Sequence, residues 1–147
     1  MPGIIVGIDG SAHSRRALEW AVSEAATRHA PLTVLTVHQA VANMWGGSPV
    51  TYIGDPELTA QALKEVQKET DDVLDAADPA SRPPSVTVRA VAGLPVEELL
   101  RAAEGADMLV VGARGAGGFK RLLLGSVSTH VTHHARCPVV VIPTDKG

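Results

Sequence analysis

The sequence predicts an α/β fold, an open five-stranded parallel sheet with helices on both of its faces. One observation is a series of five short, mostly apolar stretches, of the kind that form strands buried on both sides of a sheet. A second is that segments with helix signals separate these stretches, and this alternation is typical of parallel sheets joined by crossover helices. The chain has 147 residues and is 45% hydrophobic, enough to bury one core, so we expect a single domain spanning residues 1–147.

The elements follow one another in a regular order. The expected strands are residues 3–9, 32–37, 86–91, 108–111 and 139–142. Ser11 has the side chain of an N-cap, and an apolar stripe at helical spacing follows it, so we expect a helix from there to about His29. Further helices are expected at residues 57–77, from Pro95 to about Gly105, and from about Ser126. Residues 40–55 show neither period and are expected to form a long loop.

The most informative stretch follows the fourth strand. The apolar run of residues 108–111 ends at Gly112, and the loop after it holds Gly115 and two further glycines. A helix start at Gly125 and Ser126 comes next. Glycines let backbone N–H groups approach a phosphate, and a helix N-terminus offers unpaired donors and the positive end of its dipole. This order predicts an anion site, to which Ser126 and Ser128 add hydroxyl donors.

The spacing Gly112-x2-Gly115-x9-Gly125-Ser126 resembles the signature of one known family. The ATP-binding branch of the universal stress proteins carries G-x2-G-x9-G followed by Ser or Thr, and every fixed position is filled here. Residues 4–11 and 137–143 are also similar to the family, so the resemblance covers nearly the whole chain. It implies a Rossmann-like, adenine nucleotide alpha hydrolase-like sheet of order 3-2-1-4-5, with ATP as the ligand and Mg²⁺ accompanying the triphosphate.

The resemblance also implies which residues meet the nucleotide. In the implied strand order the first and fourth strands are neighbours, so Asp9 and Gly112 flank one crevice at the carboxyl edge of the sheet. Asp9 is an acceptor-only carboxylate suited to a ribose hydroxyl, and it could also cap the helix beside Ser11. Arg114 is either a phosphate contact or a plain surface charge. The expected nucleotide-binding set is Asp9, Val37, Gly112, Arg114, Gly115, Gly125, Ser126, Val127 and Ser128.

Three functions compete for this pocket. The predicted one is an ATP-binding stress-response protein that acts as a nucleotide-dependent sensor or interaction module, with an unknown downstream protein partner. An enzyme of phosphoryl or adenylyl transfer, such as a slow ATPase, is the alternative. The loop lacks the P-loop lysine, because Leu124 precedes Gly125 and no lysine stands before Ser126. A scaffold without nucleotide is the third, and the intact motif glycines argue against it.

Other chemistry finds little support in the sequence. His130 and His134 have the i, i+4 spacing of some zinc sites, but no glutamate accompanies them as in a metalloprotease helix, so we expect no metal site. Cys137 has no acid or base in a recognisable arrangement around it and is expected to be a buried structural thiol.

Composition limits the partners and the compartment. The net charge is −3 without a basic run, and aromatic residues make up 3% of the chain, which argues against nucleic acid and an anionic membrane. One cysteine, no signal peptide and no apolar stretch of transmembrane length favour the reducing cytoplasm. The resemblance implies a homodimer through the last strand, Val139–Ile142, which lies at a sheet edge in the implied order.

Overall fold

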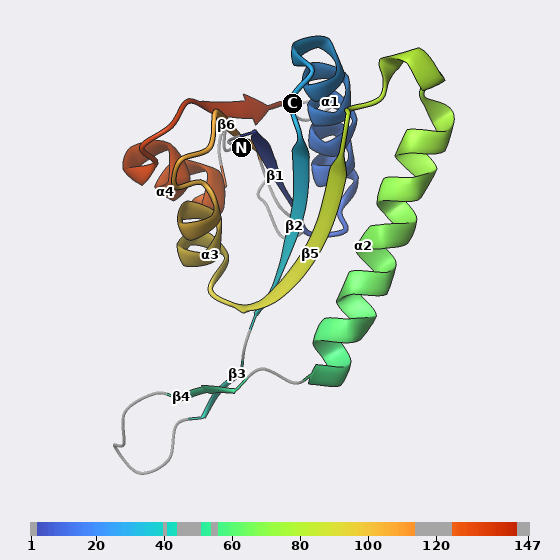
Figure 1. Ribbon diagram of the computed structural model, residues 1–147. Coiled ribbons are helices and arrows are strands. Elements are labelled where there is room, and N and C mark those ends of the chain that lie inside the picture. Colours follow the sequence, from blue (N-terminus) through green and yellow to red (C-terminus); the bar gives the residue numbers. More distant parts are fainter. Residues whose placement is uncertain (1–2, 40, 44–50, 54–55, 114–124, 144–147) are drawn as a thin grey trace.

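The computed structural model describes residues 3–39, 41–43, 51–53, 56–113 and 125–143 (Figure 1). The elements in chain order are β1 (Ile4–Ile8), α1 (Ala12–Arg28), β2 (Leu32–Gln39), β3 (Val41–Asn43), β4 (Thr51–Ile53), α2 (Pro56–Ala76), the 3₁₀ helix η1 (Pro79–Ser81), β5 (Val86–Gly93), α3 (Pro95–Ala102), β6 (Met108–Gly112), α4 (Ser126–His134) and β7 (Val139–Ile142). Each strand and helix expected from the sequence is present, with ends that differ by a few residues.

The main sheet has five strands in the order β5-β2-β1-β6-β7, and every neighbouring pair is parallel. Counted along the chain, this is the order 3-2-1-4-5, so the predicted fold class is confirmed. From β1 the chain passes through α1 to β2, on one side, whereas from β6 it passes through α4 to β7, on the other (Figure 1). The strand order therefore reverses between β1 and β6, and ligands of such sheets bind at this point.

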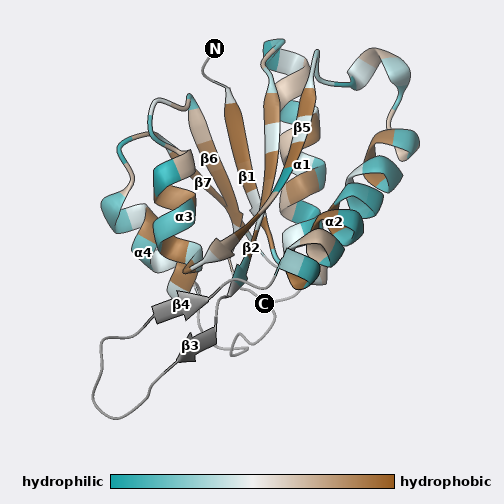
Figure 2. Cartoon of the chain, turned by 60° about the horizontal axis from the view of Figure 1, so that its bottom comes forward, coloured by the Kyte–Doolittle hydropathy of each residue, from teal (hydrophilic) through white to brown (hydrophobic). Residues whose placement is uncertain are grey.

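Helices cover the sheet on both faces, and β1 shows how the sequence divides its side chains between them. Ile4, Val6 and Ile8 pack in a cluster with α1 and α2, whereas Ile5 packs in a second cluster with α3 and α4. Figure 2 shows the brown, apolar sides of the helices turned toward the strands. The apolar stripe expected in the first helix is buried completely or nearly so; its members are Leu18, Ala21, Val22 and Ala25. Among the described residues, no helix is both long and apolar enough to cross a membrane.

The segment expected to be a long loop contains a short hairpin. β3 and β4 pair antiparallel, with Val41 opposite Ile53 and Asn43 opposite Thr51. The expectation of a wholly irregular loop was wrong here, because two strands of three residues each are too short to show a period in the sequence. The hairpin projects beyond the carboxyl ends of the main strands (Figure 1).

α2 buries one polar side chain in an otherwise apolar stripe. Val66, Thr70 and Val73 face the core, and Thr70 is 0% exposed. Its Oγ1 has no hydrogen-bond partner among the described residues. A buried hydroxyl without a partner costs free energy because it loses its bonds to water.

We therefore expect Thr70→Val, which keeps the branched shape and removes the hydroxyl, to raise the free energy of unfolding by roughly 1 kcal/mol. Thr59→Val is the matched control, since Thr59 is on the same helix but only half-buried. Denaturant unfolding of the three proteins provides the comparison. A less stable Thr70→Val protein would contradict the prediction, because it would mean that the hydroxyl makes a bond worth keeping.

Candidate functional site

Three of the residues singled out in the sequence meet at the carboxyl edge of the sheet. Ile8 of β1 lies opposite Thr36 of β2, and Val6 of β1 lies opposite Val110 of β6. Continued toward the carboxyl ends, these registers place Asp9 between Val37 on one side and Ala113, the residue after Gly112, on the other. The structure thus brings Val37, Asp9 and the end of β6 into one row at the point where the strand order reverses.

The residues on either side of segment 114–124 are hydrogen-bonded to each other through Ala113. Its carbonyl oxygen accepts hydrogen bonds from the Gly125 N–H and from Ser128 Oγ, the latter at 2.9 Å. The Ala113 N–H in turn donates to the Ile142 carbonyl of β7 at 2.8 Å. The start of α4 is therefore held directly against the end of β6, and the first and last glycines of the motif, Gly112 and Gly125, lie close together.

The N-terminus of α4 has no side-chain cap. Its N-cap is Gly125, with φ −81° and ψ 176°, and no side chain of the described residues accepts from the first turn. Thr129 N–H makes the bond to the Gly125 carbonyl at 3.0 Å that begins the intrahelical series. The N–H groups before it, on Ser126 to Ser128, have no carbonyl acceptor within an α-helix. Together with the exposed Ser126 side chain, they form a donor group suited to an anion.

Ser128 has a different environment from the one expected of a phosphate ligand. It is 2% exposed, and its Oγ lies 2.9 Å from the Ala113 carbonyl and 3.1 Å from the Gly125 carbonyl. A hydroxyl has one proton, and here it is directed at backbone oxygens inside the protein. In this structure the Ser128 hydroxyl joins the strand to the helix, and its N–H belongs to the first turn of α4. Val127 between the two serines is half-buried and packs with α3.

Asp9 takes part in a turn that starts α1. Its side chain is exposed, and its Oδ1 accepts from the Ser11 N–H at 2.9 Å. Its own N–H donates to Ser14 Oγ at 3.2 Å. Ser11 is the N-cap of α1, as predicted, and its Oγ accepts from the Ser14 N–H at 3.1 Å. The carboxylate therefore supports the helix start, the second of the two roles considered for it, and stands at the crevice as well.

Sequence reasoning missed Ser14, and Arg114 and Gly115 lie outside the described residues. Ser14 is 4% exposed although it is polar and lies in the first turn of α1. A signal for it exists in the spacing Asp9-x-Ser11-x2-Ser14, in which a small hydroxyl stands at the third helical position after a serine cap. Val37 is half-buried and packs with the cluster under α3 and α4.

Comparison with known proteins decides the family. A sequence model of the universal stress protein family matches residues 2–143. This chain belongs to that family. It is 37% identical over 146 residues to a universal stress protein of Mycolicibacterium smegmatis, an alignment covering 97% of this chain and 48% of the relative. The chain spans about half the length of the curated relatives it matches.

Solved structures of the family have the same fold. The universal stress protein UspA from Lactobacillus plantarum matches with a TM-score of 0.68 and 25% identity, covering 96% of this chain and 97% of that one. A universal stress protein crystallised in complex with cAMP matches with a TM-score of 0.67 and 26% identity, covering 97% of this chain and 96% of the other. Both matches span nearly the full length of this chain, so the fold is shared with these two relatives.

A second carboxylate, that of Glu69, interacts electrostatically with Asp9. Burial raises the pKa of Glu69, on α2, while the Arg15 guanidinium opposes the rise and the carboxylates of Asp9 and Asp72 add to it. The charges of Glu69, on α2, and of Asp9, before α1, therefore affect each other. The sequence analysis missed it because a charged residue in an amphipathic helix is usually on the solvated face. Negative charge around Asp9 favours neutral or donor groups of a ligand there over its phosphates.

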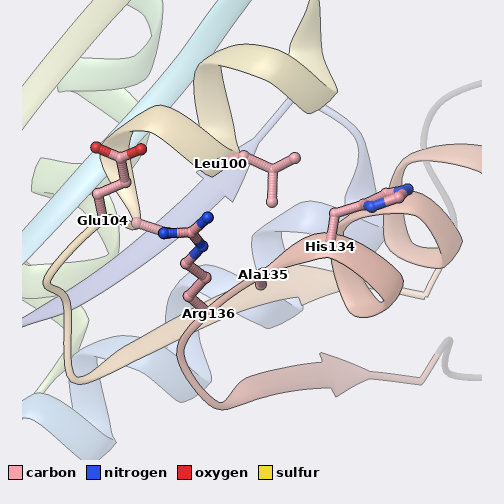
Figure 3. Close-up of a pocket in the computed structure, with 6 residues that line it drawn as sticks. Leu100, Glu104, His134, Ala135 and Arg136 are labelled. Atoms are coloured by element: carbon pink, nitrogen blue, oxygen red, sulfur yellow. The ribbon is translucent and has the colours of Figure 1, made fainter.

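One hollow lies away from the crevice. A hollow of about 110 Å³ between the C-terminal ends of α3 and α4 is lined by Leu100, Ala103, Glu104, His134, Ala135 and Arg136 (Figure 3). It contains none of the predicted nucleotide-binding residues.

Within the described residues, no group of three His, Cys, Asp or Glu side chains is placed to hold a metal ion. His130 Nδ1 lies 2.7 Å from the Ser126 carbonyl oxygen, and Cys137 is half-buried in the core beside β7, where burial raises the pKa of its thiol.

The two serines at the start of α4 should behave differently when replaced by alanine. Without nucleotide, we expect Ser128→Ala to lower the free energy of unfolding by about 1–2 kcal/mol, because the buried bond to Ala113 is lost. Ser126→Ala removes an exposed hydroxyl and should change stability by less than about 0.5 kcal/mol. Denaturant titration of both variants gives the comparison. Equal, small effects would show that Ser128 does not fasten the helix to the strand.

Proposed function

We propose that this chain binds ATP at the carboxyl edge of its sheet and belongs to the ATP-binding branch of the universal stress proteins. The observation that carries the proposal is the closure at Ala113, which places Gly112 and the uncapped start of α4 together, next to Asp9. The bound nucleotide would make the protein a sensor or interaction module in the stress response, recognised by a protein partner. We treat residues 1–147 as one universal stress protein domain.

The phosphates belong at the start of α4. The N–H groups of Ser126, Val127 and Ser128 supply donors and the positive end of the helix dipole, and the Ser126 hydroxyl adds another donor. The motif places Gly115 and Arg114 beside the same phosphates, where a backbone without Cβ and a guanidinium both suit an anion. Mg²⁺ in such a site is held mainly by phosphate oxygens and water, which needs no dedicated set of carboxylates from the protein.

The adenosine half belongs between β1 and β2. The exposed Asp9 carboxylate is an acceptor for ribose hydroxyls, and the Val37 backbone one strand away meets the adenine ring. The related structure with cAMP supports an adenine nucleotide in this family. The Asp9 carboxylate at this end, and the helix N–H donors at the other, favour one direction for the nucleotide.

Three substitutions and two ligands test this assignment. Gly115→Val puts a β-branched side chain among the phosphate donors, so we expect it to weaken both ATP and tripolyphosphate at least about tenfold. Asp9→Ala should weaken ATP by a similar factor and leave tripolyphosphate unchanged, because its partner is the ribose. Asp107→Ala is the matched control, an exposed aspartate at the amino end of β6. Calorimetric titration gives the affinities, with circular dichroism to check folding.

Several outcomes would contradict the assignment. A folded Gly115→Val protein with unchanged affinity removes the motif loop from the site. If Asp9→Ala weakens the binding of ATP and of tripolyphosphate equally, Asp9 does not contact the ribose. ADP or AMP accumulating during the titrations would favour the alternative, an enzyme of phosphoryl or adenylyl transfer working in the same pocket.

We also propose that the chain forms a homodimer through β7. Among the strands of the described sheet, β7 is paired with β6 alone, so one side of its backbone is at an edge. Val139, Val140 and Val141 are half-buried, and an aliphatic edge of this kind carries none of the lysines that deter pairing. Two copies meeting antiparallel about a two-fold axis would pair the edge groups and close the assembly.

Light scattering at micromolar concentration tests the dimer. We expect Val140→Lys and Val141→Lys to shift the protein to monomer, because each puts a charge into the proposed apolar contact. Thr87→Lys, at an exposed position of the opposite edge strand β5, should stay dimeric. If the Val140→Lys and Val141→Lys proteins both remain dimeric, the interface lies elsewhere. A monomeric parent protein would overturn the proposal.

A further inference from the structure

The hydroxyl of Ser14 connects the end of β1 to the first turn of α1. The side chain is 4% exposed, so it is out of reach of a ligand in the crevice. Its Oγ donates to the Ser11 carbonyl at 3.1 Å and accepts from the Asp9 N–H at 3.2 Å. The bond to Asp9 holds the backbone of the residue that carries the exposed carboxylate.

The arrangement is a capping box that is completed through Asp9. The Ser11 side chain accepts from the Ser14 N–H, which is the first half of such a box. In the usual second half, a Glu or Gln at the third helical position bonds back to the N-cap N–H. Serine is too short for this, and the Ser11 N–H is bonded by Asp9 Oδ1 at 2.9 Å instead. Ser14 then bonds to the Asp9 backbone, so the helix start and the carboxylate are fixed as one unit.

Gly10 forms the turn between Asp9 and the start of α1, and the bonds of Asp9 to Ser11 and Ser14 help to orient its side chain. Gly10 has φ +83°, a left-handed conformation that glycine adopts without strain, and a Cβ built there would meet no atom within 4 Å. Neither a bulky side chain nor packing around Gly10 therefore holds the turn in place. Two hydrogen bonds contribute to holding it: the bond from the Ser11 N–H fixes the Asp9 side chain, and the bond to Ser14 Oγ fixes its main chain.

We propose that Ser14 is a positioning residue for ribose recognition: it holds the Asp9 backbone so that the carboxylate faces the ribose hydroxyls. The proposal rests on the proposed function, since it takes the ribose contact of Asp9 from it. Losing the Ser14 hydroxyl removes this acceptor from the Asp9 N–H and loosens the backbone that carries the carboxylate. The phosphate donors at the start of α4 are on another strand–helix connection and are unaffected.

The test compares Ser14→Ala with Ser23→Ala, the same substitution at an exposed position of the same helix. Affinities are measured by calorimetry for ATP, for 2′,3′-dideoxy-ATP, which lacks both ribose hydroxyls, and for tripolyphosphate. We expect Ser14→Ala to weaken ATP about five- to thirtyfold while the other two ligands change by less than about twofold. Ser23→Ala should change none of the three. Equal weakening of all three ligands by Ser14→Ala would show a general structural role and overturn the proposal.

A double-mutant cycle and a nucleotide-free measurement complete the test. In an Asp9→Ala background, Ser14→Ala should cause no further loss of ATP affinity, and independent, additive losses would overturn the proposal. Without nucleotide, hydrogen exchange of the Asp9 amide should be faster in Ser14→Ala, and unchanged protection would also overturn it. A parent protein that binds ATP and the dideoxy analogue equally would remove the ribose role of Asp9, and with it that of Ser14. A parent that binds none of the three ligands would overturn the proposed function itself.

Discussion

The Ala113 carbonyl oxygen is the point on which the candidate site depends. It accepts bonds from the backbone of Gly125 and from the buried Ser128 hydroxyl, and so it holds the start of α4 against the end of β6. Because Ala113 is itself bonded to the Ile142 carbonyl of β7, the helix start is fixed to the sheet and not only to a loop. Every phosphate donor assigned to α4 takes its position from this connection.

Two helices, α1 and α4, begin at the same edge of the sheet, and their N-termini are capped differently. α1 is capped internally, because the Ser11 hydroxyl accepts from the Ser14 N–H, and both serines bond to Asp9. α4 begins at a glycine that offers no side-chain acceptor, so its first N–H groups need an acceptor from outside the helix. One helix start presents an acceptor and the other presents donors, which matches the two ends of a nucleotide. The parallel register between β1, β2 and β6 sets the two starts side by side.

The strands, and the helix starts at the carboxyl edge of the sheet, followed from local sequence patterns. Runs such as residues 108–111 and 139–142 are apolar throughout, which only doubly covered strands require, and each proved to be a strand of the parallel sheet. Ser11 as a cap and Gly125 with Ser126 as a helix start also followed, because capping depends on residues close in the chain. The strand order needed the resemblance to the family, since local patterns carry no information about which strands are neighbours.

What the sequence could not give depends on contacts between distant segments. The inward direction of Ser128 is set by Ala113, fifteen residues earlier, and nothing in the local pattern separates it from the exposed Ser126. Glu69 is half-buried because α2 packs beside α1, which brings it within reach of Arg15 and Asp9. The β3–β4 hairpin was not predicted because three residues are too few to show a period, and such strands are recognised only by their pairing.

The central claim is that the crevice between β1 and β6 holds ATP. The most direct measurement is the identity of the nucleotide carried by the purified protein, released by denaturation and identified by ion-exchange chromatography and mass spectrometry. The account predicts ATP in a stoichiometric amount, recovered unchanged after incubation. Protein that carries no adenine nucleotide and takes up none when ATP is supplied would contradict it.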